Sequence, residues 1–142
     1  MNINYYNTFI TVAPDCPAET GIIPPDKKDG RTKPSLEYEL AAGQPYGYTQ
    51  EELLFEVYVR HKQIAEEELA GRRQEHWDEF FGKSQACLRA SMLPKKYGWG
   101  IHFDGDGKMA LIPKESEAYQ RYIENENGEL KVVPAMRSSK AK

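Results

Sequence analysis

The amino-acid sequence predicts an α+β fold, in which a small antiparallel sheet packs against three or four helices in a single compact domain. Three observations lead to this prediction. A β-branched and aromatic run lies near the N-terminus, apolar residues recur at helical spacing through the middle of the chain, and a glycine-rich turn joins two apolar stretches further on. At 142 residues the chain has the length of one domain, and it can bury a core without disulfide support.

The first predicted strand covers residues 5–13, YYNTFITVA. Its β-branched and aromatic residues favour the strand conformation, and neither of its two alternating faces is strongly polar. We therefore expect this strand to lie inside the sheet. Pro14 ends it, because proline has no backbone N–H to give to a neighbouring strand.

Residues 17–34 form the least regular segment of the predicted domain. Four prolines, two glycines and the charged run DKKD leave little that favours a helix or a strand. Irregular loops of this length are uncommon in compact domains unless they act as lids or are disordered. We expect a mobile loop here, and the choice between a lid and simple disorder stays open.

The predicted helical layer follows this loop. A short helix is expected over residues 35–42, with Ser35 as its N-cap. A second helix begins at Thr49, which together with Glu52 fits a capping box, where each side chain bonds to the backbone N–H of the other residue. Apolar residues then recur at three- and four-residue steps, and Gly71 is expected to end or bend this long helical stretch.

Residues 87–113 are interpreted as one more strand followed by a β-hairpin. The run DGDG at residues 104–107 indicates a tight turn, because glycine and aspartate accept the positive φ angles of short hairpin loops. A loop of two or four residues places Ala110 and Ile112 on the same face as Trp99, whereas a three-residue loop exchanges the faces. We favour the first register, which makes both faces of the hairpin largely apolar.

Beyond the hairpin, residues 116–125 are expected to form a short helix and residues 130–133 a last strand at the edge of the sheet. Residues 137–142 are polar and basic with nothing to bury, so we expect them to be disordered. The predicted domain therefore spans residues 1–125, and residues 126–142 form a C-terminal extension.

The hairpin region contains the residues that point to a ligand site. An arginine between apolar neighbours is costly to bury unpaired, so Arg89 needs either a glutamate of the helical layer or an anionic ligand. Glycines 98 and 100 leave a hollow in a strand, and such hollows admit a helix, a second backbone or a ligand. The predicted ligand-binding residues, which could together hold a small acidic or phosphorylated molecule, are Arg89, Lys95, Tyr97, Trp99 and His102.

An enzymatic alternative uses Cys87 or His102. Arg89 lies close enough in sequence to lower the pKa of the Cys87 thiol, and His102 could act as the base from across the sheet. The competing interpretation is a buried cysteine that packs as a small hydrophobic residue. Because no third group that orients the histidine can be identified, we favour a non-enzymatic binding or interaction module over a small enzyme acting on an acidic substrate.

Metal sites and cofactors are not expected. The DGDG run resembles part of a calcium loop, but aligning its last glycine with the obligatory glycine of such a loop puts His102 and Pro113 where the first and last carboxylate ligands belong. The cysteines and histidines show no CxxC or HxxxH pair of the kind that zinc sites use.

The composition narrows the range of partners. The chain carries 19 basic and 22 acidic residues, a formal net charge of −3, so it has no general attraction for nucleic acid or anionic membranes. No apolar run approaches the ~18 residues of a membrane span. Two cysteines are too few for a disulfide framework. We expect a cytoplasmic protein, and a homodimer formed through the exposed edge of the hairpin stays open.

Three stretches resemble an uncharacterised family of small, mostly bacterial proteins, a domain of unknown function. They are NTFITVAPDCP, PYGYTQEELLFEV and CLRASMLPKKYGWGIHFDGDGKMAL. The similarity covers the chain up to about Tyr122, and the third stretch is long enough to be specific. The resemblance implies a single compact domain, but it assigns no activity and carries over no functional residues.

Overall fold

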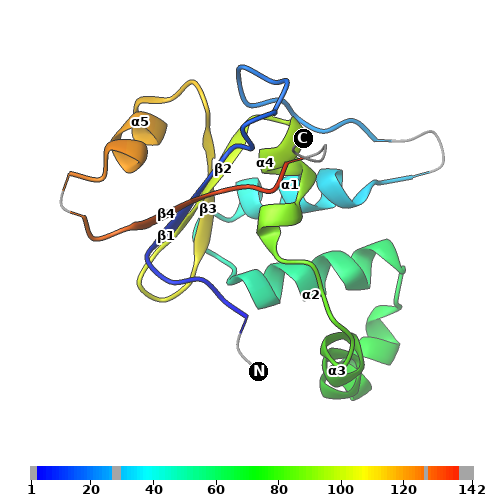
Figure 1. Cartoon of the computed structure of the whole chain (residues 1–142). Helices are drawn as coiled ribbons and strands as arrows, with labels where there is room; N and C mark the ends of the chain where they lie inside the picture. The colour runs from blue at the N-terminus through cyan, green and yellow to red at the C-terminus, as the bar shows by residue number, and fades with distance from the viewer. Residues whose placement is uncertain (1–2, 27–29, 127, 138–142) are drawn as a thin grey trace.

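The structure, a computed structural model, describes residues 3–26, 30–126 and 128–137. The predicted α+β class is confirmed: a sheet is covered on one face by α1, α2 and α4 and on the other by α5 (Figure 1). The elements in chain order are β1 (Thr8–Thr11), α1 (Lys33–Gly43), α2 (Gln50–His61), α3 (Glu66–Phe81), the 3-10 helix η1 (Leu88–Ala90), α4 (Met92–Lys96), β2 (Trp99–Phe103), β3 (Met109–Pro113), α5 (Glu117–Glu124) and β4 (Lys131–Pro134).

The sheet is mixed, whereas the sequence predicted an antiparallel one. Within the described residues the strand order is β3-β2-β1-β4, with β1 antiparallel to β2 and parallel to β4. The last strand is parallel because the chain leaves β3 at one edge, crosses the outer face through α5 and enters β4 at the opposite edge (Figure 1). A crossover of this kind joins parallel strands, whereas a tight hairpin joins antiparallel ones.

The hairpin is present, but the favoured register was wrong. His102 pairs with Ala110 and Trp99 with Pro113, so the intervening loop has an odd number of residues. The Asp104 carboxylate accepts hydrogen bonds from the backbone N–H groups of Asp106 and Lys108, each at 2.9 Å, which closes a longer turn than the glycines alone suggest. The odd loop exchanges the two predicted faces of β3.

The strand predicted to start at Cys87 is absent, and this part of the chain forms η1 and α4 instead. Ser91 caps α4 by accepting a hydrogen bond from the backbone N–H of Leu93 at 3.1 Å. Pro94 follows in the first helical turn, where its missing N–H costs nothing, whereas in a sheet it would interrupt the pairing. Local capping therefore outweighs the alternating pattern that had suggested a strand.

The inner face of the sheet carries the main core. Ile10, Ile101 and Phe103 are fully buried against Leu53 and the apolar side of α1. The predicted capping box is confirmed, since Thr49 Oγ accepts from the Glu52 N–H at 3.2 Å and the Glu52 carboxylate accepts from the Thr49 N–H at 2.9 Å. Helix α1 begins slightly earlier than predicted, with Thr32 rather than Ser35 as its N-cap.

The long helical stretch is interrupted earlier than predicted, between His61 and Glu66, and α3 then bends near Gly71 as predicted, because Arg72 has non-helical backbone angles inside it. The helix packs on α2 through aromatic rings: Trp77 lies 5.0 Å from Phe55, and Phe80 lies 4.5 Å from Tyr58 between ring centroids. This places α3 beside α2 at the end of the molecule away from α5 (Figure 1).

The irregular segment predicted as a mobile loop runs beside the start of β2. Ile22 accepts a hydrogen bond from the Trp99 indole at 2.8 Å, and its N–H donates to the Tyr97 carbonyl at 2.8 Å. Residues 27–29 of this segment, and residues 138–142 of the predicted disordered tail, lie outside the described residues. The mobility of the loop stays a prediction.

Candidate functional site

The structure does not bring the predicted ligand-binding residues together. Trp99 is on the inner side of the sheet, where its ring lies 5.4 Å from that of Tyr38 in α1. His102 is on the outer side, where it stacks on Tyr122 of α5. The two residues belong to the same strand but point to opposite faces of the sheet, so their rings cannot line one pocket.

Among the described residues, the Arg89 side chain pairs with a backbone carbonyl and with no glutamate of the helical layer. Its Nε–H donates to the Pro134 carbonyl at the end of β4 at 2.7 Å, and its own carbonyl accepts from the Met136 N–H at 2.8 Å. These bonds attach the end of β4 to η1. Lys95 is half-buried in the last turn of α4, and the neighbouring Tyr97 lines a different cleft from that of His102.

The predicted glycine hollow is filled by the protein itself. Gly98 has φ +77°, and a β-carbon there would collide with the Thr20 carbonyl of the irregular segment. At Gly100 a β-carbon would lie 2.7 Å from the Phe9 ring and 2.8 Å from the Tyr119 ring. A second backbone and two aromatic rings, rather than a ligand, explain these glycines.

His102 is nevertheless the centre of a well-ordered cluster on the outer face. Its Nδ1 is hydrogen-bonded to the Tyr46 hydroxyl at 2.8 Å. Its ring stacks on Tyr122, with centroids 4.3 Å apart and planes inclined by 12°. Burial lowers the pKa of His102 and outweighs the opposing charge of Asp104, so the imidazole is neutral at pH 7. The cluster therefore presents polar edges without a positive charge.

Tyr46 holds this cluster from an unusual backbone conformation. Its φ is +59°, a region that residues other than glycine rarely adopt. The conformation is held by its backbone N–H, which donates to the Met109 carbonyl of β3 at 2.7 Å. Burial, together with the adjacent Tyr122 phenol and the Asp104 carboxylate, raises the pKa of Tyr46 well above its usual range. The phenol is therefore a permanent neutral partner of His102.

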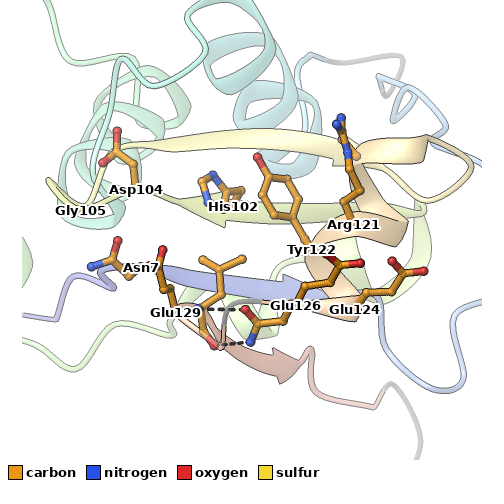
Figure 2. Close-up of a pocket in the computed structure, with 12 residues that line it drawn as sticks. Asn7, His102, Asp104, Gly105, Arg121, Tyr122, Glu124, Glu126 and Glu129 are labelled. Carbon is orange, nitrogen blue, oxygen red and sulfur yellow. Dashed lines mark hydrogen bonds between the residues drawn. The ribbon is translucent and has the colours of Figure 1, made fainter.

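A cleft of about 660 Å³ opens beside this cluster, between the hairpin turn, α5 and the turn that leads into β4. Figure 2 shows the His102 and Tyr122 rings in the middle of the cleft, with carboxylates around them. The Asn125 side chain fixes the lower boundary by donating to the Leu130 carbonyl at 2.7 Å and accepting from its N–H at 3.2 Å. The lining residues are Asn7, His102, Asp104, Gly105, Ala118, Arg121, Tyr122, Glu124, Asn125, Glu126, Glu129 and Leu130.

The charge of this outer cleft is negative. Its acidic lining residues are Asp104, Glu124, Glu126 and Glu129, against one base, Arg121. Figure 2 shows the Arg121 guanidinium turned away from Glu124 and Glu126. The C-terminal end of α5 adds a partial negative charge at the same place. Among the described residues no group of three or more carboxylates, histidines or cysteines converges to hold a metal ion.

Cys87 and His102, the two candidates for catalysis, lie at different sites. Cys87 lines a pocket on the helical side of the sheet, and its sulfur accepts a hydrogen bond from the Tyr5 hydroxyl at 3.4 Å. Burial and the adjacent thiol raise the pKa of Tyr5 to about 12, so the phenol stays protonated and cannot serve as a base. His102 lines the cleft on the other face of the sheet, so it is not the base for Cys87 in this arrangement.

Comparison with known proteins agrees with the family resemblance of the motifs quoted above. The family model described as "Family of unknown function (DUF6157)" matches residues 1–141. The chain belongs to this family. Neither a curated protein nor a solved structure matches it. Among the described residues, no helix has both the length and the apolar character needed to cross a membrane.

Proposed function

We propose that this family member is a non-enzymatic binding module whose outer cleft takes a small organic cation, such as an alkyldiamine. The observation that supports this proposal is the composition of the cleft, where four carboxylates and a helix C-terminus surround a neutral cluster of rings. The sequence alone had favoured an anionic ligand. The acidic lining reverses the expected charge of the ligand at this cleft.

Organic cations fit this surface better than metal ions do. The carboxylates are spread around the cleft instead of converging on one point, which suits a flexible chain with separated ammonium groups. The Tyr122 ring, which lines the cleft and stacks on His102 with centroids 4.3 Å apart, adds an aromatic surface that attracts a cation. Hydrogen bonds from an ammonium group to exposed carboxylates complete the recognition.

Putrescine is a suitable probe, and NMR amide shifts on the full-length protein can follow its binding. We expect shifts that map to α5, the hairpin turn and the start of β4. The double variant Glu124→Gln/Glu126→Gln should weaken binding by about fivefold, as expected for two exposed charges each contributing at most ~1 kcal/mol. The double variant Glu75→Gln/Glu79→Gln, which removes two exposed carboxylates from α3, is the matched control and should bind as the wild type does.

Two outcomes would overturn the proposal. Equal weakening by both double variants would mean that putrescine responds only to net charge. Shifts that map to residues outside the cleft would place the diamine elsewhere. A local site should also lose affinity at high salt less completely than diffuse binding does, because ions close to the bound ligand are screened less.

The predicted small anion has a second candidate location. A separate cleft of about 900 Å³ is lined by Tyr97, Lys96, Lys33 and His61, and its Asp26 already pairs with Arg31 at 2.8 Å. Inorganic phosphate, titrated in the same NMR experiment, tests this site. Shifts confined to these residues would support anion binding there, whereas uniform shifts at lysines throughout the surface would contradict it.

The enzymatic alternative, in which Cys87 or His102 acts on a bound acidic substrate, stays a prediction. We also propose a cytoplasmic location, which the two free thiols, Cys16 and Cys87, support because reducing compartments keep cysteines unpaired. A homodimer that pairs through the edge of the hairpin stays a prediction, since β3 lies at one edge of the sheet.

A further inference from the structure

A second pocket lies on the opposite side of the sheet from the outer cleft. It has a volume of about 200 Å³ and is formed by α1, the C-terminal half of α2, the end of α3 and the segment that leads into α4. We call it the inner pocket. Its lining residues are Lys33, Glu37, Leu54, Val57, Tyr58, His61, Lys62, Phe80, Gln85, Ala86, Cys87, Leu88, Ala90 and Ser91.

The floor of the inner pocket contains a buried carboxyl group. Glu37 is 8% exposed, and its Oε1 accepts a hydrogen bond from the Ser91 hydroxyl at 2.8 Å. Ser91 is fixed in turn, because its oxygen caps α4 by accepting from the Leu93 N–H. Among the described residues, no hydrogen bond reaches Glu37 Oε2, and this atom is not one of those sealed from solvent. Oε2 is therefore available to a donor that enters the pocket.

Polar groups in the inner pocket are arranged by sign. The acid is at the floor, whereas the exposed bases Lys33, His61 and Lys62 stand at the rim. Apolar side chains make up much of the remaining lining, and Val57 and Leu88 among them are buried. A molecule with a positive end, a short hydrocarbon middle and a negative end would match all three kinds of lining group.

The buried carboxyl has only part of the compensation that an ionised group needs. Burial raises the pKa of Glu37 to about 7, and the Ser91 hydrogen bond and the Lys33 charge counteract that rise only in part. Burying a carboxylate is costly unless a cation and further hydrogen bonds accompany it. A ligand ammonium group would supply both.

We propose that the inner pocket binds a small amino-carboxylate zwitterion, with its ammonium group on Glu37 and its carboxylate at the rim bases Lys33 and Lys62. The ammonium group donates to Oε2, and the methylene groups between the two charges contact the apolar lining. The proposal is independent of the outer cleft, since the two sites share no residue.

Binding is linked to the release of a proton. The ammonium group binds ionised Glu37, so the proton that Glu37 holds before binding leaves to the solvent. The charged and titratable groups that face Glu37 are Lys33 on its own helix, Tyr58, His61 and Lys62 on α2, and Cys87 before η1. With the pKa of Glu37 at about 7, affinity should be about tenfold higher at pH 8 than at pH 6.

The experiment uses the two cysteines as reporters. Cys87 lines the inner pocket, whereas the similarly half-buried Cys16 is outside it. Alkylation of full-length protein by iodoacetamide is followed by peptide mass spectrometry, with ω-amino acids from 3-aminopropanoate to 6-aminohexanoate as probes. We expect probes of one chain length to slow labelling of Cys87 at least fivefold and to leave Cys16 unchanged. n-Butylamine, which lacks the carboxylate, should protect at least tenfold less well.

Substitutions at Glu37 and Lys62 test separately the binding of the ammonium group and of the carboxylate. Glu37→Gln should abolish protection by every probe at both pH 6 and pH 8. Lys62→Gln should weaken the amino acids severalfold and leave n-butylamine unchanged, and Lys83→Gln, an exposed lysine outside the pocket, is the control. Absence of protection at 100 mM probe, equal protection of both cysteines, or retained protection in Glu37→Gln would each overturn the proposal. If Glu37→Gln does not fold, the pH dependence of the wild type decides: a flat profile contradicts it.

Discussion

The outer cleft and the inner pocket arrange the same kinds of residues in opposite ways. In the outer cleft, exposed carboxylates surround a neutral ring cluster built on His102. In the inner pocket, exposed bases surround a buried carboxyl, Glu37. The outer cleft has its carboxylates exposed, whereas the inner pocket has its carboxyl buried. Position relative to solvent, and not residue type, separates them.

This difference decides which site affects the stability of the fold. Charges at a solvated rim are screened, and each contributes little to folding. A carboxyl group removed from water loses its hydration and shifts its own proton equilibrium. We therefore expect the outer cleft to act through the potential that it presents to a ligand, and the inner pocket to act on both binding and stability. The predictions that follow test this contrast.

The largest expected effect comes from Glu37→Gln. A carboxyl whose pKa is higher in the folded than in the unfolded protein favours folding when protonated. Its contribution is therefore complete below about pH 4.5, the unfolded value, and is lost as the pH rises through about 7. The shift corresponds to about 3 kcal/mol. Glu37→Gln keeps the shape and an acceptor for Ser91, so it should gain about that much over the wild type between pH 4 and pH 8.

Urea unfolding of both proteins across this pH range measures the difference. Taking the difference cancels the carboxyl groups whose pKa is lowered on folding, such as Asp26 and Glu52, because they are common to both proteins. The matched variant at the other site, Glu124→Gln, should show no pH-dependent gain. A constant difference between wild type and Glu37→Gln at every pH would show that Glu37 is not desolvated.

A second test breaks the outer cleft without touching the inner pocket. Gly100→Ala places a β-carbon 2.7 Å from the Phe9 ring and 2.8 Å from the Tyr119 ring, so these rings and α5 must move. Overpacking of this kind costs roughly 2 kcal/mol. Gly43→Ala is the control, since nothing lies within 4 Å of its β-carbon, and its effect should stay within about 1 kcal/mol.

Ligand assays on the Gly100→Ala variant sharpen the comparison. Putrescine affinity at the outer cleft should fall, because Tyr122 belongs to the displaced helix. Protection of Cys87 by an ω-amino acid should persist, because the inner pocket lies on the other face of the sheet. Loss of both would mean that the two sites are coupled through the sheet.

Local signals in the sequence predicted most of the fold. The capping box at Thr49 and the bend near Gly71 depend on residues within a few positions of one another, and both are present. The direction of β4 depends on where α5 crosses the sheet, which no local pattern encodes. At Ser91 two local patterns competed, and capping by a side chain prevailed over strand alternation.

The candidate sites were harder to predict, because each depends on contacts between distant residues. His102 was singled out from its strand, but its hydrogen-bond partner Tyr46 is 56 residues away. Arg89 donates a hydrogen bond to a carbonyl 45 residues away in the sequence, and not to a carboxylate. Glu37 carried one readable signal: it stands three residues before the buried Leu40, on the apolar side of α1. Spacing alone could have marked it as buried.

The smallest expected effect concerns the hydrogen bond that orients His102. Tyr46→Phe removes the hydroxyl from Nδ1, and loss of one partly exposed hydrogen bond costs about 1 kcal/mol.

Because burial lowers the folded pKa of His102, the contribution of this residue to folding stability is complete above about pH 6.5 and is lost as the pH falls through the folded value. NMR titration of the imidazole should place its midpoint below the usual value in the wild type. If Tyr46→Phe leaves the ring in place but frees Nδ1 for water, the midpoint should rise toward the usual value, and putrescine should bind more weakly below it as positive charge enters the outer cleft. An unchanged midpoint would show that Tyr46 does not set the charge of His102, and the neutral centre of the cleft would then depend on burial by Tyr122 alone.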